Sequence, residues 1–237
     1  MSVVEHIWYV AYGSNMSRER FSYYLRGGRP DGSERDYPGC RDTSDPADTF
    51  GLLISGGVYF AGHSSGWRAG MAFYDPHADG QVAAKAYLIT AEQFVDVLAQ
   101  ETRRSPGMSL DLTPTLRGDR YSKGVGGYSM LVRLGERRGV SLVTFTRDRS
   151  AAPSLAAPSA SYLLTMASGL REAHGWSQAQ INRYLSALPG VAPITRRDSL
   201  AHHSREASHR YPRSGRSLHR VVPKRDRSPY MQRNSQQ

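Results

Sequence analysis

The stretch IWYVAYGSNMSRERF, Ile7–Phe21, joins an apolar run, a Gly-Ser-Asn turn and the start of a helical pattern. Ile7–Tyr12 is apolar and aromatic throughout, which predicts a buried strand. Residues 16–25 place apolar side chains among charged ones, which predicts a short helix with Asn15 or Ser17 as its N-cap. A strand that turns directly into a helix leaves backbone N–H groups pointing outward. The turn is therefore a candidate cradle for a carboxylate or a developing oxyanion.

The pattern downstream of this stretch mixes short strands with helices. Strands are expected at 52–54, 58–60, 70–74, 82–89, 128–134 and 140–146, helices at 91–103, 161–174 and 177–188, and a long loop at 26–50. The close spacing of the first four strands predicts an antiparallel meander, and the last two strands predict a hairpin. This order departs from a regular βαβ alternation, so it predicts an α+β fold.

The charge is distributed unevenly along the chain. Of the formal net charge of +10, residues 196–237 hold eleven Lys or Arg against three Asp or Glu, a net of +8, so residues 1–195 are nearly neutral. The segment 196–237 has few apolar residues and no periodicity, which predicts a basic disordered tail. Weak contacts with nucleic acid or an acidic partner are the interactions that such a tail suggests. Residues 1–195 are long enough for one catalytic domain with a core.

Cysteine content and the N-terminus suggest the compartment. The single cysteine, Cys40, excludes an intrachain disulfide and a cysteine-rich metal site. The apolar run before Gly13 is too short for a signal sequence or a membrane span. We therefore expect a reduced, cytoplasmic protein without membrane contact, and we leave its oligomeric state open.

One carboxylate falls on the apolar side of a predicted helix. The helix 91–103 begins after Thr90, a good N-cap, and at 100° per residue Glu101 lies in its apolar stripe. That stripe consists of Phe94, Val97 and Leu98. An inward carboxylate is costly unless it is paired or protonated, and burial would raise its pKa towards the range useful for a general acid or base. Alternatively, Glu101 forms a structural ion pair with an arginine such as Arg103, Arg104 or Arg133.

Four blocks of the sequence, in order, resemble the γ-glutamylcyclotransferase superfamily. They are YGSN at 12–15, SSGWRAGMAFY at 64–74, AAKAYLITAEQFVDVLAQE at 83–101, and the segment from APSASY to the helix pair that ends at Pro189. The resemblance covers roughly residues 7–190. The chain departs from the family pattern at Ala69 and Thr102, where many members have glycine, and in its long loop at 26–50.

The resemblance implies a fold, a reaction and a set of site residues. The fold would be a small mixed β-barrel or sheet flanked by helices. The reaction would be a cofactor-free cyclotransfer of the lyase type, in which the α-amine of a γ-glutamyl group attacks its own γ-carbonyl and releases 5-oxoproline and an amine. Glu101 would be the catalytic acid and base, and the substrate-binding residues would be Tyr12, Gly13, Ser14, Asn15, Gly70 and Tyr162. Trp67 would frame the pocket.

Two other functions remain compatible with the sequence. An amide hydrolase could use the same pocket, with water in place of the internal amine. A non-catalytic binding module could act through its basic tail. The leaving amine of a γ-glutamyl substrate is not specified by these residues.

Overall fold

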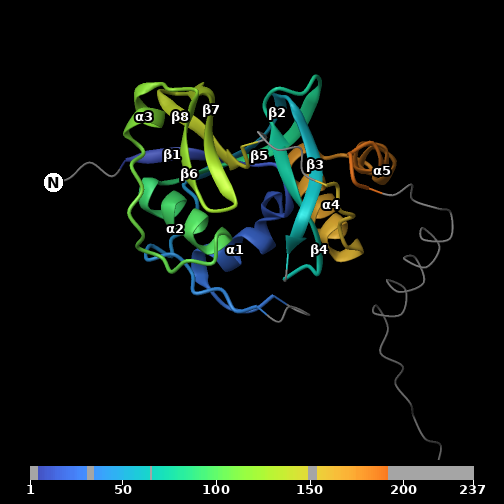
Figure 1. Ribbon diagram of the computed structural model, residues 1–237, viewed down its shortest axis with the longest axis horizontal. Coiled ribbons are helices and arrows are strands. Elements are labelled where there is room, and N and C mark those ends of the chain that lie inside the picture. Colours follow the sequence, from blue (N-terminus) through green and yellow to red (C-terminus); the bar gives the residue numbers. More distant parts are fainter. Residues whose placement is uncertain (1–4, 31–34, 65, 149–153, 192–237) are drawn as a thin grey trace, which may run out of the picture. The chain divides into compact units, whose positions relative to one another are not determined.

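The computed structural model describes residues 5–30, 35–64, 66–148 and 154–191 (Figure 1). Its strands are β1 (His6–Ala11), β2 (Asp48–Ser55), β3 (Gly57–Ser64), β4 (Ala69–Asp75), β5 (Gln81–Thr90), β6 (Tyr121–Val125), β7 (Tyr128–Arg137) and β8 (Val140–Thr146). Its helices are the 3-10 helix η1 (Ser14–Met16), α1 (Arg18–Arg26), α2 (Ala91–Glu101), α3 (Thr113–Arg117), α4 (Ala160–His174) and α5 (Gln178–Ser186). The predicted tail at 196–237 lies outside the described residues.

Six strands form a mixed sheet in the order β2-β5-β1-β8-β7-β6. β1 runs parallel to β8, with Trp8 opposite Leu142, and antiparallel to β5. The remaining pairs in this sheet are antiparallel. From Ile7 to Ala11 every residue of β1 is buried, because the strand is covered on both faces. A mixed sheet with flanking helices confirms the predicted α+β class.

The predicted antiparallel meander is wrong. β3 and β4 pair with each other as a separate two-stranded sheet, while β2 pairs with β5. A single residue, Gly56 at φ 131°, separates β2 from β3, which is too short for a hairpin loop between adjacent strands. The chain therefore leaves the large sheet at Gly56. Figure 1 shows β3 and β4 beside α4, where the rings of Phe60 and Tyr162 are in edge contact.

The predicted hairpin is confirmed as β7 and β8, and the two C-terminal helices are confirmed as α4 and α5. Gly175 ends α4 in the left-handed conformation, at φ 64°. The described residues of the predicted loop at 26–50 that follow α1, 27–30 and 35–47, belong to no helix or strand named above, and β2 begins at Asp48, earlier than expected. Among the described residues, no helix is long and apolar enough to cross a bilayer.

The helix ends follow the sequence expectation only in part. Ser17, one of the two predicted N-caps, caps α1, because its side chain accepts a hydrogen bond from the Arg20 N–H. α2 ends at Glu101, two residues earlier than predicted. The Thr102 hydroxyl donates to the Leu98 carbonyl at 2.9 Å and so closes the last turn. The positive φ that commonly follows a helix falls on Arg103, at 58°, so Thr102 needs no glycine-like freedom.

The turn after β1 is held between α4 and β5. Gly169 of α4 approaches it so closely that an added Cβ would lie 2.4 Å from the Cβ of Met16 and 2.6 Å from the Ser17 nitrogen. From β5, the Tyr87 hydroxyl lies 3.0 Å from the carbonyl oxygen of Asn15 and 2.9 Å from that of Met16, where it donates. These contacts fix η1 relative to the sheet.

We predict that Gly169→Ala destabilises the protein by about 1–3 kcal/mol, because the added methyl group meets backbone atoms that cannot rotate away. In an unconstrained helix the same change would stabilise by about 1 kcal/mol. Urea unfolding measures the difference. Leu164→Ala, at an exposed position of the same helix, is the control and should stay within about 0.5 kcal/mol of the wild type. A Gly169→Ala protein as stable as the wild type would contradict the close approach.

Candidate active site

Glu101 lies beside a small cavity at the point where α2 meets η1. The wall is formed by Tyr9, Tyr12, Gly13, Ser14, Asn15, Ala72, Glu101, Tyr128, Phe145 and Tyr162. The Nδ2 of Asn15 donates a hydrogen bond to Glu101 Oε1 at 3.0 Å. The helix ends at Glu101, so its half-buried carboxylate extends from the last turn towards the Gly-Ser-Asn turn. The cavity measures about 30 Å³, which is room for a water molecule, since about 10–15 Å³ by this measure already holds one.

The Asn15 side chain is only partly satisfied. Its Nδ2 also donates to the Tyr9 hydroxyl at 3.2 Å. Its Oδ1 is buried and has no hydrogen-bond partner. An unpaired buried acceptor costs about 1–3 kcal/mol, and a ligand that donates to it would remove that cost. Because the Glu101 carboxylate is held by the other end of the same amide, the two acceptors together favour a cationic N–H donor such as an ammonium group.

The Tyr162 hydroxyl lies on the other side of the turn. Its oxygen accepts a hydrogen bond from the Ser14 N–H at 3.5 Å and from the Ala72 N–H at 3.4 Å. An added Cβ on Gly13 would lie 2.8 Å from this oxygen. The absence of a side chain at Gly13 thus lets this hydroxyl lie close to the turn. Two backbone N–H groups thus point at one hydroxyl, whose proton is left for another acceptor.

The phenols around Glu101 stay protonated at neutral pH. Burial raises the pKa of Tyr9, Tyr128 and Tyr162, and the negative charge of Glu101 raises each of them further. Burial also raises the pKa of Tyr12, whose hydroxyl donates to the Phe145 carbonyl at 2.9 Å. The Glu101 carboxylate is therefore surrounded by neutral aromatic side chains.

The structure brings together five of the six predicted substrate-binding residues with Glu101. The sixth, Gly70, packs against the segment before α4: its N–H donates to the Ala157 carbonyl at 2.8 Å, and an added Cβ would lie 2.0 Å from the Ala156 oxygen. Substrate contact by Gly70 therefore stays a prediction that this cavity does not support. Trp67 lies outside the wall, with its ring centroid 4.9 Å from that of Tyr162.

Sequence reasoning missed part of the wall. The residues that it did not single out are Tyr9, Ala72, Tyr128 and Phe145. Tyr9 lies three positions before Tyr12 in a strand that is buried on both faces, so no alternation marks the side that it lines. Tyr128 and Phe145 come from β7 and β8, and their sequences read as ordinary core strands.

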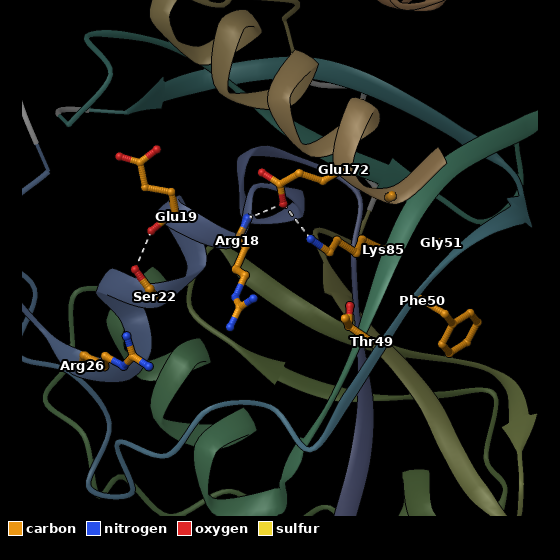
Figure 2. Close-up of a pocket in the computed structure, with 10 residues that line it drawn as sticks. Arg18, Glu19, Ser22, Arg26, Thr49, Phe50, Gly51, Lys85 and Glu172 are labelled. Carbon is orange, nitrogen blue, oxygen red and sulfur yellow. Dashed lines mark hydrogen bonds and ion pairs between the residues drawn. The ribbon is translucent and has the colours of Figure 1, made fainter. Parts of the chain in front are cut away.

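A larger cavity lies elsewhere, at the start of α1 (Figure 2). It measures about 760 Å³ and shares no residue with the wall around Glu101. In Figure 2, Glu172 receives hydrogen bonds from the Lys85 ammonium at 2.7 Å and from the Arg18 backbone N–H at 2.9 Å. Arg26 pairs with Asp45 at 2.7 Å. These charges already satisfy one another, and the Glu172 contacts tie α4 to the start of α1 behind the turn.

The described part of the chain contains no candidate metal site. No group of three or more His, Cys, Asp or Glu side chains there is placed to hold an ion.

Comparison with known proteins gives the following similarities. No protein-family model matches the chain. Histone deacetylase 5 of Arabidopsis thaliana is 31% identical over 198 residues, which is 76% of this chain and 30% of that protein. The chain thus spans less than a third of the length of this relative, and the name of the whole protein does not tell what the matched part does.

Two solved structures are also similar. One is described as a gamma-glutamyl cyclotransferase, with a TM-score of 0.45 and 13% identity over 84% of this chain and 99% of that one. The other is an uncharacterized protein from Homo sapiens, with a TM-score of 0.45 and 14% identity over 83% of this chain and 98% of that one.

Cys40 is not placed as a nucleophile. It is buried, and its thiol donates to the Tyr24 carbonyl at 3.3 Å. Burial raises the pKa of Cys40 to about 12, and the carboxylates of Asp96 and Asp42 add to the effect. The thiolate is the reactive form of cysteine, so this thiol is inert at neutral pH.

We predict that a chromogenic disulfide reagent leaves Cys40 unmodified in the folded protein at pH 8, where only about one thiol in ten thousand is ionised. The reagent should label it fully after unfolding in guanidinium. The folded state holds the pKa above that of the unfolded chain, so this thiol opposes folding increasingly as the pH rises above about 8.5. Fast stoichiometric labelling of the folded protein at pH 8 would contradict this environment.

Proposed function

We propose that this chain is a cofactor-free enzyme of the γ-glutamylcyclotransferase superfamily, which releases 5-oxoproline and a free amine from a γ-glutamyl compound. The observation that carries the proposal is the contact between Asn15 and Glu101 at the cavity, because it joins the YGSN turn to the carboxylate expected to transfer the proton. The order of the four sequence blocks supports the same reaction.

The α-ammonium group of the substrate binds between Glu101 and Asn15. The carboxylate accepts one N–H, and the unpaired Oδ1 of Asn15 accepts another. Neutral aromatic rings around the site add cation–π attraction and exclude water. Glu101 then takes one proton from the ammonium, which frees the nitrogen lone pair.

The γ-carbonyl oxygen lies against the Tyr162 hydroxyl. This hydroxyl accepts from the Ser14 and Ala72 N–H groups, which polarise it and strengthen its donation to a developing oxyanion. The amine attacks the carbonyl carbon and forms a C–N bond, which closes a five-membered ring. The proton held by Glu101 passes to the leaving nitrogen, and the bond between that nitrogen and the carbonyl carbon breaks. The ring nitrogen then gives its second, surplus proton to the Glu101 carboxylate, which passes it to the released amine. The products are the neutral lactam and an ammonium ion, and Glu101 ends as a carboxylate, so protons and charges balance without a cofactor.

Intramolecular attack suits a cavity with a largely aromatic wall. The nucleophile and the carbonyl belong to one molecule, so holding the substrate folded supplies most of the alignment. An amide hydrolase would need a positioned water molecule in the same space. The aromatic wall suits cyclisation, and the product distinguishes the two reactions.

We predict that Glu101→Gln lowers the rate of 5-oxoproline release by at least about 100-fold, because the amide cannot accept and return a proton. Mass spectrometry of γ-glutamyl compounds incubated with the protein measures the product. Glu92→Gln is the matched control, since Glu92 lies exposed on the same helix and pairs with Arg41 at the surface.

The control variant should keep the wild-type rate. A Glu101→Gln protein with full activity would show that the proton is transferred elsewhere. Free glutamate in place of 5-oxoproline would identify an amide hydrolase. Absence of both products across γ-glutamyl amines, amino acids and peptides would count against the proposed activity.

We predict that Tyr162→Phe lowers kcat by about 10- to 1,000-fold while the protein stays folded, because the oxyanion loses its donor. The ring contacts with Phe60 and Trp67 remain in this variant, but the Ser14 and Ala72 N–H groups lose their acceptor, so the melting temperature should fall by several degrees without loss of the fold. Steady-state kinetics gives kcat, and unchanged kcat would remove Tyr162 from the reaction.

A further inference from the structure

Arg20 is a buried cation that the proposed reaction does not use. It lies on the inner side of α1, with 7% of its surface exposed. Its guanidinium carbon lies 4.5 Å from the ring centroid of Tyr37, 5.1 Å from that of Tyr24 and 5.3 Å from that of Trp67. Three aromatic rings thus form a cage around one positive charge.

The hydrogen bonds within this cage leave part of the Arg20 guanidinium group without a partner. Its NH2 nitrogen donates to the Tyr37 hydroxyl and, at 3.5 Å, to the Tyr24 hydroxyl. Its Nε is buried and has no hydrogen-bond partner. Phenols and rings stabilise a guanidinium without neutralising it, and an unpaired buried N–H of a charged group is costly. A carboxylate matches what is missing, since it brings the opposite charge and accepts two N–H groups side by side.

The cage adjoins the Glu101 cavity. Trp67 contacts Arg20 on one side and, at 4.9 Å between ring centroids, Tyr162 of the cavity wall on the other. The two places also share an electrostatic environment. Burial lowers the pKa of the Arg20 guanidinium, but Tyr24, Tyr37 and the Glu101 carboxylate together raise it above its ordinary value. A ligand bound at Tyr162 therefore has Trp67 and Arg20 as its next neighbours in this direction.

We infer that Arg20 binds a carboxylate on the leaving group, so that the substrates are γ-glutamyl amino acids or peptides rather than γ-glutamyl amines. This inference rests on the proposed function. The α-carboxylate of the glutamyl group shares a carbon with the ammonium and so stays near Glu101 and Asn15. The leaving group departs from the carbonyl at Tyr162, which is the wall residue in contact with Trp67.

The test compares γ-glutamyl-alanine with γ-glutamyl-ethylamine, which differ by one carboxylate on the leaving group. We expect the wild type to prefer γ-glutamyl-alanine by about 10- to 100-fold in kcat/KM, the effect of a charge-assisted hydrogen bond. Arg20→Gln should remove this preference, and Arg20→Lys should keep part of it, because lysine retains the charge but lacks the planar fork. Arg26→Gln, at the exposed end of the same helix, is the control and should keep the full preference.

Binding to an inactive protein separates this inference from the proposed activity. Calorimetry measures the affinity of Glu101→Gln, with and without Arg20→Gln, for both compounds. If the acid binds more tightly through Arg20 but no 5-oxoproline forms in the wild type, the carboxylate site stands and the cyclotransferase proposal fails. If the wild type forms 5-oxoproline from both compounds equally well, or Arg20→Gln keeps the preference, the carboxylate site is overturned and the cyclotransferase proposal stands. The wild-type comparison decides the question even if Arg20→Gln does not fold.

Discussion

The hydrogen bond from the Asn15 amide to the Glu101 carboxylate joins two segments that are 86 residues apart in the chain. It has this effect only because both ends are fixed. Gly169 and Tyr87 hold the turn from α4 and β5, and the Thr90 capping box starts α2 in a defined position. A cavity whose chemistry depends on one carboxylate and one amide needs such rigidity, since a shift of 1 Å would separate them.

The site combines one negative charge with neutral, partly satisfied groups. Phenols with raised pKa values surround Glu101, and Asn15 Oδ1 is left without a partner. Such unsatisfied groups lower the stability of the fold, and proteins tolerate them where a bound ligand supplies the missing hydrogen bonds. The larger cavity at the start of α1 shows the opposite arrangement, because Lys85, Glu172 and the Arg18 N–H already satisfy one another. Chemistry, rather than volume, distinguishes the candidate active site.

Local sequence signals were reliable where one interaction dominates. Thr90 precedes α2 and accepts the expected backbone hydrogen bond. Ser159 and Ser177 cap α4 and α5 in the same way. Helical periodicity alone placed Glu101 on the inner side of α2. The strand pairing was harder to predict from the sequence, because β5 could pair with any of several apolar strands. The one-residue link at Gly56 decided that β3 would leave the sheet.

Arg20 marks the limit of such reasoning. An arginine among charged residues at the start of a helix reads as solvent-exposed, and only its spacing of four residues from Tyr24 places it near the apolar side. The aromatic cage is completed by Tyr37 from a long loop and by Trp67 from the turn between β3 and β4, neither of which is close to α1 in sequence. The cage therefore forms only when these distant segments pack together in the tertiary structure.

By itself, the sequence determined the α+β class, the strand-turn-helix unit at Ile7–Phe21 and the inward position of Glu101, because these follow from short-range periodicity and capping. Only the tertiary structure decided that Asn15 holds Glu101, that Tyr162 receives the Ser14 and Ala72 N–H groups, and that Gly70 packs on Ala156. The reason is physical: such contacts depend on how distant segments pack, and each segment alone satisfies its local preferences equally well without them.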